Sequence, residues 1–257
     1  MIVLKSPQEI EKMRLVNSEV AQILQILKER VRPGITTGDL EEIAAEELKK
    51  RKIEGAFKGV PNPSGRGMAF PANLCTSVND EIVHGVPSKK RELRDGDLLS
   101  IDFGVYSSGF YGDAAVSCAV GNVSAGARKL IRIAEESLAA GIEAARPGNT
   151  VGDIGAAVQE IVEGAGYNVV REFVGHGIGT SLHEDPQVPN FGVRGRGIKL
   201  KAGMVLAIEP MINAGASGVK VDPDGWTART RDGSLAAHVE HTIAVTEDGP
   251  VILSRLG

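Results

Sequence analysis

The sequence predicts an α+β protein made of two similar halves, in which an antiparallel or mixed β-sheet is covered by helices. Two repeats support this prediction. Residues 93–102 align with residues 200–209, and in both a basic residue and a glycine precede a short apolar run that ends in a carboxylate. Residues 32–40 match residues 146–154 at six of nine positions, each time between two amphipathic segments. The order helix, turn, helix and strand therefore occurs twice.

Length and composition are those of an ordinary globular protein. The 257 residues, 42% of them hydrophobic and 24% charged, can bury a sizeable core. We interpret residues 1–257 as a single domain that arose by internal duplication, with halves at approximately 1–121 and 122–257. The net charge of -4 argues against a nucleic-acid surface as the main function. Two cysteines, no signal peptide and no apolar run of about 20 residues predict a cytoplasmic protein outside the membrane.

The first long amphipathic helix is expected from residue 6 onward. Ser6 and Glu9 can form a capping box, and apolar residues then recur at three- and four-residue steps up to Val31. Pro33 and Gly34 end this helix.

Three further helices follow from similar signals. Thr36 and Asp39 begin a second helix, and the matching pair in the second half is expected at about 124–145 and 151–165. Between the second helix and the first long strand, the glycines and prolines of residues 59–71 predict an irregular loop. That loop could be a plain connector or the rim of a pocket.

Four acidic residues are associated with the predicted strands. After Asp102 the chain turns at Ser108-Gly109 and returns through Asp113, which places these two carboxylates side by side. Glu209 ends its own strand, and Glu240 lies on a later one. Four clustered carboxylates repel each other unless cations neutralise them. For either repeated strand taken alone, a chance match or a strand end in water is the preferred explanation of the acid, whereas the pair together favours a shared site.

One histidine completes a set that resembles a two-metal site, where carboxylates bridge two ions and a shared water becomes the nucleophile. His176 has glycines on both sides, which let the backbone approach a crowded site. Its glycine pattern fits neither a dinucleotide fingerprint nor a P-loop. Taken alone, the motif is also compatible with a glycine-rich turn that carries a surface histidine.

In order and spacing, these residues closely resemble the methionine aminopeptidases, over nearly the whole chain. The resemblance also includes residues 77–85 and His183, seven residues after His176. It implies the pita-bread fold, with two pseudosymmetric halves, and a binuclear metal site. The ligands that it implies are Asp102, Asp113, His176, Glu209 and Glu240.

Within the pita-bread group the chain resembles type I methionine aminopeptidases. The stretch 183–209 is too short for the additional helical subdomain of type II. No large domain precedes the first helix, which disfavours the proline-specific relatives prolidase and aminopeptidase P. Creatinase-like and purely binding members have lost metal ligands, whereas all five are present here.

The resemblance also implies roles for residues outside the ligand set. His84 is expected near the scissile amide and the leaving nitrogen, His183 at the substrate carbonyl, and Glu209 as the proton shuttle. Two residues depart from the family pattern: Leu182 stands where an aromatic is common, and Ala114 where a threonine is common. The residues expected to line the methionine pocket, each of which could equally be ordinary core, are Phe70, Cys75, Leu182 and Trp226.

The implied function is hydrolytic removal of the N-terminal methionine, by a metal-bridging hydroxide, from nascent polypeptides with a small second residue. This is a step of protein maturation. The cofactors would be two divalent metal ions, manganese, iron, cobalt or zinc, because carboxylate and imidazole donors accept all four. The expected partners are nascent polypeptide N-termini, which a cytoplasmic monomer could meet at the ribosome, with no direct nucleic-acid function.

Three alternatives remain beside this function. The first is an Xaa-Pro aminopeptidase or prolidase-like hydrolase. The second is a non-catalytic pita-bread protein that binds nascent chains. A metal-dependent phosphoesterase is disfavoured, because no basic phosphate clamp accompanies the acidic segments.

Overall fold

An antiparallel sheet of nine strands forms the centre of the molecule in the computed structural model, which describes residues 2–62, 65 and 67–255. Its main path has the order β1-β4-β5-β14-β9-β7-β8, with β2 paired to β4 and β15 paired to β14. The strands of this sheet are β1 (Glu54–Gly55), β2 (Leu74–Val78), β4 (Leu98–Ser107), β5 (Phe110–Ala119), β7 (Gly175–Gly177), β8 (Glu184–Val188), β9 (Val205–Ile208), β14 (Glu240–Thr246) and β15 (Gly249–Ile252).

Two small sheets of three strands each flank the central one. The first has the order β13-β10-β6 and the second β11-β12-β3. Their strands are β3 (Glu81–Val83), β6 (Asn168–Val169), β10 (Met211–Asn213), β11 (Val219–Val221), β12 (Ala228–Thr230) and β13 (Ala236–His238).

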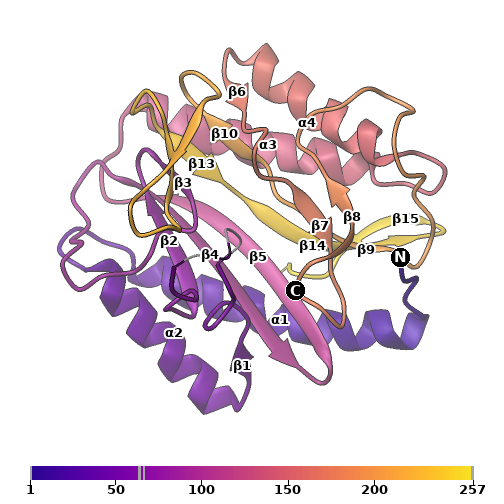
Figure 1. Cartoon of the computed structure of the whole chain (residues 1–257), viewed down its shortest axis with the longest axis horizontal. Coiled ribbons are helices and arrows are strands. Elements are labelled where there is room, and N and C mark those ends of the chain that lie inside the picture. The colour runs from indigo at the N-terminus through magenta and orange to yellow at the C-terminus, as the bar shows by residue number, and fades with distance from the viewer. Residues whose placement is uncertain (1, 63–64, 66, 256–257) are drawn as a thin grey trace.

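Two helix pairs pack against the central sheet, one from each half of the chain, and lie at opposite ends of the view in Figure 1. The first pair is α1 (Pro7–Arg30) and α2 (Thr37–Arg51), and the second is α3 (Ala125–Ala144) and α4 (Val151–Gly164). All four agree with the predicted ranges within a few residues. The capping box predicted for the first helix is confirmed, because Ser6 and Glu9 exchange the expected hydrogen bonds. Thr36 and Asp39, predicted to begin the second helix, form a capping box as well.

Each helix pair covers its own apolar core. Met13, Leu27 and Leu40 belong to one buried cluster, which also contains the inner residues of β4. Leu130 and Ile154 belong to a second cluster, with Leu206 of β9 and Ile243 of β14. Burial of the apolar stripes predicted from the sequence therefore holds both pairs against the sheet.

The hairpin that carries the first two acids is confirmed, but one of its predicted boundaries was wrong. The chain turns at Ser108-Gly109, both with positive φ, and Ser107 pairs with Phe110. Asp102, however, lies in the middle of β4 and not at its end, because the strand continues through Phe103 and Val105, which are fully buried. Glu209 does follow the end of its strand, β9.

The described part of the loop between β1 and β2 is irregular, the two cysteines are buried, and no described helix could span a membrane. Among residues 59–71 the described ones form neither helix nor strand, as predicted, while residues 63, 64 and 66 lie outside the described residues. Cys75 and Cys118 are both buried and unpaired. In the part of the chain that the structure describes, no helix is long and apolar enough to cross a membrane.

Candidate metal centre

The strand register brings the predicted ligands to one face of the central sheet. Asp102 on β4 and Glu240 on β14 both pair with Ala115 on β5, the strand between them. Asp113 lies two residues before Ala115 and therefore points to the same side. The three carboxylates thus meet on one face although they come from three strands.

The other two predicted ligands join that face through β9. Ala207 of β9 pairs with both His176 of β7 and Thr242 of β14. Glu209, two residues after Ala207, has the same orientation and lies beside Glu240. Residues separated by more than a hundred positions in the sequence are therefore neighbours across five strands.

The ligand atoms lie close enough to share metal ions. Donor atoms of Asp113, His176 and Glu240 all lie within 4.8 Å of one another, and so do those of Glu209, His238 and Glu240. Glu240 belongs to both groups. The Nε2 atom of His176 is 3.5 Å from a carboxylate oxygen of Glu209.

Several carboxylate oxygens at this site have no partner within the protein. Asp102 Oδ1, Asp113 Oδ1 and Glu240 Oε1 are buried and accept no hydrogen bond among the described residues. A buried carboxylate oxygen without a partner is costly. Divalent cations would supply the missing partners, so the residues present fit a metal centre.

Burial also changes the protonation of the four carboxyl groups. It raises the pKa of Asp102 to about 7 and that of Glu209 to about 8. Burial and then mutual repulsion raise the pKa of Asp113 and of Glu240 well above the usual range. Bound cations would reverse this effect, because they stabilise the ionised form.

His176 is prepared to bind a metal through one nitrogen. Burial lowers its pKa to about 3, so the imidazole is neutral near pH 7. Its Nδ1 atom lies 2.9 Å from the carbonyl oxygen of Gly177, which it can reach as a donor. That hydrogen bond leaves Nε2 free as the metal ligand.

The two non-ligand histidines of the prediction lie next to the acidic cluster. The ring of His183 packs edge-on against that of His176 at 4.5 Å. His84 follows β3 with a φ of 60°, and its ring makes edge contacts with Phe173 at 5.4 Å and Trp226 at 6.2 Å. Burial lowers the pKa of His84 to about 4 and also lowers that of His183.

An apolar wall adjoins these histidines. The rings of Phe70 and Trp226 meet edge to face at 5.1 Å, and Trp226 Nε1 donates to the carbonyl oxygen of Met68. Burial raises the pKa of the Cys75 thiol well above its usual value, so Cys75 is a neutral part of the wall and not a thiolate.

All the predicted site residues line one cavity of about 750 Å³. Their placement agrees with the prediction, and the role of each remains a proposal. They are Phe70, Cys75, His84, Asp102, Asp113, His176, Leu182, His183, Glu209, Trp226 and Glu240.

Sequence reasoning assigned no role to His238, which is buried at the back of this site. Its Nε2 atom has no hydrogen-bond partner among the described residues and lies 3.4 Å from a carboxylate oxygen of Glu209. The one feature of the sequence that could have placed His238 at the metal centre is its position two residues before the predicted ligand Glu240. The strand break at Val239, between β13 and β14, was not apparent from the sequence and decides where His238 points.

Comparisons with known proteins agree with this architecture. The model of metallopeptidase family M24 matches residues 11–247. The methionine aminopeptidase of Clostridium perfringens is 52% identical over 256 residues, and methionine aminopeptidase 1 of Bacillus subtilis is 46% identical over 256 residues; both alignments cover 100% of each chain.

A solved structure gives the same result for the fold. The crystal structure of methionine aminopeptidase from Thermotoga maritima has a TM-score of 0.94 and 44% sequence identity, with 100% of each chain covered. The predicted resemblance and the predicted α+β pita-bread fold are both confirmed.

Proposed function

The chain belongs to metallopeptidase family M24 and, within it, to the methionine aminopeptidases, and from this premise we propose how its residues release an N-terminal methionine. The protein is a metal-dependent aminopeptidase, which hydrolyses the first peptide bond of its substrate. The observation that carries the proposal is the convergence of five candidate ligands from five strands of one sheet. They would hold two divalent ions, manganese, iron, cobalt or zinc, and are Asp102, Asp113, His176, Glu209 and Glu240.

The ligands divide between the two proposed ions according to their positions. Glu240 would be shared by the two ions, because it belongs to both groups of neighbouring donor atoms, and we assign Asp113 as the second shared ligand. Asp102 would hold one ion. His176 and Glu209, whose side chains approach to 3.5 Å, would hold the other. Bound there, the ions would activate a water as the nucleophile and polarise the scissile carbonyl.

Glu209 is the proposed carrier of the proton. Burial raises its pKa to about 8 in the metal-free site, and bound cations would lower that pKa again, so the carboxylate would be ionised and able to accept a proton. In the reaction it would take the proton of the attacking water on a carboxylate oxygen and give it to the departing amine nitrogen.

The two non-ligand histidines would orient the scissile bond. His84 would hydrogen-bond near the leaving nitrogen, and His183, whose ring lies 4.5 Å from that of His176, would steady the carbonyl oxygen as negative charge develops on it. Both side chains are neutral near pH 7, because burial lowers both pKa values. A neutral imidazole can donate one hydrogen bond without placing a full charge near the metals.

The apolar wall would bind the methionine side chain. Phe70, Trp226, Leu182 and Cys75 line the same cavity as the acids, and all four are buried. An unbranched thioether fits an aromatic and aliphatic pocket and contacts ring edges favourably. A narrow mouth next to the metals would favour a small second residue.

We extend the proposal to the setting of the protein. The substrates would be the N-termini of nascent polypeptides, which a cytoplasmic monomer would process at the ribosome. Residues 1–257 would act as one catalytic domain that arose by duplication, with halves at approximately 1–121 and 122–257.

Peptide release tests the proposed function. The protein loaded with manganese, iron, cobalt or zinc should release methionine from Met-Ala-Ser, and a chelator should abolish the release. Ala-Pro-Ser is the matched control, because a prolidase-like hydrolase would prefer it. Release from the proline peptide alone, or from neither peptide with any of the four metals in a folded protein, would contradict the proposal.

A further inference from the structure

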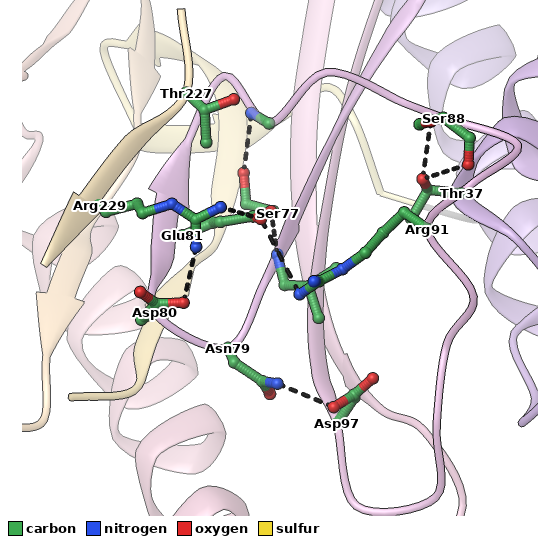
Figure 2. Close-up of polar contacts among 12 residues, drawn as sticks. Thr37, Ser77, Asn79, Asp80, Glu81, Ser88, Arg91, Asp97, Thr227 and Arg229 are labelled. Atoms are coloured by element: carbon green, nitrogen blue, oxygen red, sulfur yellow. Dashed lines mark hydrogen bonds and ion pairs between the residues drawn. The ribbon is translucent and has the colours of Figure 1, made fainter. Parts of the chain in front are cut away.

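Outside the metal centre, one arginine is surrounded by three carboxylates. Arg229 of β12 donates from Nε to Asp222, from Nη1 to Asp80 at 2.8 Å and from Nη2 to Glu81 at 2.8 Å. Figure 2 shows its side chain extending toward Glu81 and Asp80. Each nitrogen of the guanidinium therefore has a carboxylate of its own, an arrangement that lysine cannot reproduce.

This network is partly shielded from water. The Arg229 side chain is 24% exposed and that of Glu81 only 9%. Burial disfavours the charge on Arg229, but the hydrogen bond to Asp222 and the charges of Glu81 and Asp80 raise its pKa. The second oxygen of Glu81 accepts from the backbone of Val78 at 2.7 Å. The interactions thus reach from β12 to the end of β2.

The network joins two segments that lead directly into the substrate cavity. Glu81 begins β3, which ends at Val83, immediately before His84. Asp222 and Arg229 enclose the turn that carries Trp226, and Arg229 pairs with Glu81 across the two strands. The network therefore connects the strand before His84 to the turn that carries Trp226.

Both rings need such support. His84 has a φ of 60°, a left-handed conformation that a non-glycine residue adopts only when its surroundings enforce it. Trp226 sits in a turn whose backbone donates to Asp224, and its ring lies 6.2 Å from that of His84. The two rings line the cavity, whereas Arg229 does not.

We propose that Arg229 is a positioning residue, which holds His84 and Trp226 at their observed spacing through Glu81, Asp80 and Asp222. The inference rests on the proposed function, in which Trp226 binds the methionine side chain and His84 faces the scissile amide. A substrate whose methionine side chain contacts Trp226 and whose scissile amide faces His84 would have its peptide bond correctly placed at the metals. Loss of the network would let the two rings shift relative to each other.

Trp226 is the one tryptophan of the chain, so tryptophan fluorescence reports on this site alone. In metal-loaded Arg229→Met, Trp226 emission should shift to the red and acrylamide should quench it more strongly. KM for Met-Ala-Ser should rise and kcat/KM should fall by roughly 10-fold with unchanged metal content, because small misplacements are expensive in catalysis. Arg229→Lys should recover part of both effects.

Arg231→Met is the matched control. Arg231 lies two residues further along and is exposed, and among the described residues its side chain donates only to the carbonyl of Val219. This variant loses the same charge and should keep the emission, the quenching and the kinetics of the wild type.

Two results would overturn the proposal. The first is folded Arg229→Met with wild-type emission and wild-type KM, and the second is a shift in emission with unchanged kinetics. If Arg229→Met does not fold, Asp222→Ala replaces it; this variant removes one of the three contacts and should shift emission and KM in the same direction by less. Fluorescence does not require turnover, so a wild type without peptidase activity would contradict the proposed function and leave the positioning result readable.

Discussion

Glu209 is the residue at which the proposed ligand and proton-transfer roles meet. One of its carboxylate oxygens faces His176 Nε2 at 3.5 Å and the other faces His238 Nε2 at 3.4 Å. Its position was predictable, because the repeat of an apolar strand followed by an acid marks it in the sequence. His238 was not predictable as its neighbour, because the break between two strands sets the direction of that side chain.

The substitution Glu209→Gln separates the two proposed roles of this residue. The amide keeps the shape of the side chain but cannot take up the proton, so kcat should fall by roughly 100-fold or more. Metal content measured on the same sample shows whether ligation survives. Glu160→Gln, the same change at an exposed ion pair with Arg194, should leave kcat unchanged. Full turnover by Glu209→Gln with both metals bound would remove the proton-shuttle role and leave the fold assignment intact.

At the scale of elements, the chain before α1 is tied to the segment that carries Leu182 and His183. The Lys5 ammonium donates to Glu184, and the other Glu184 oxygen accepts from the backbone of Ser181 at 3.2 Å. Gly179 leaves room for this contact, because a Cβ there would come within 2.5 Å of the Lys5 side chain. The ion pair therefore closes the turn that precedes β8.

Lys5→Met should release that turn. The Lys5 side chain is 4% exposed and that of Glu184 13%, so the substitution leaves a poorly hydrated carboxylate without its cationic partner. The free energy of unfolding should fall by about 2 kcal/mol, as for other lost hydrogen bonds to charged groups. Chemical denaturation measures it. Lys12→Met, at an exposed position of α1, is the control, and its loss of unfolding free energy should be only a small fraction of that for Lys5→Met. Equal stability of the two variants would contradict the role of Lys5 in holding the turn before β8.

Helices were more predictable than the small strands, for a physical reason. Caps and apolar periodicity are local, and the four helices follow from them directly. The extension of β4 beyond Asp102 depends on pairing with β5 and on burial of Phe103, which are tertiary effects. Short strands such as β3 and β12 also pair across distant parts of the sequence, so the Arg229 network had no local signal.

At the scale of the molecule, the metal centre is a consequence of sheet register. Asp102, Ala115 and Glu240 form one row across β4, β5 and β14, and Ala115 leaves space between the two acids. The sequence alone indicated which acids should meet, by their repeated setting and by their resemblance to a family. It could not supply the register, which depends on how Asp102 and Glu240, far apart in the sequence, each pair with Ala115 of β5. The proposed duplication would explain why each half contributes equivalent strands to this row.

Anomalous X-ray diffraction from a crystal of the manganese- or cobalt-loaded protein, recorded on both sides of the absorption edge of the metal, tests the metal centre most directly. We predict two anomalous peaks in the cavity, both contacted by Glu240 and Asp113, with Asp102 at one and His176 and Glu209 at the other. Such peaks would locate the ions independently of activity. A single peak, or peaks that these five side chains do not contact, would contradict the two-metal centre proposed for this chain.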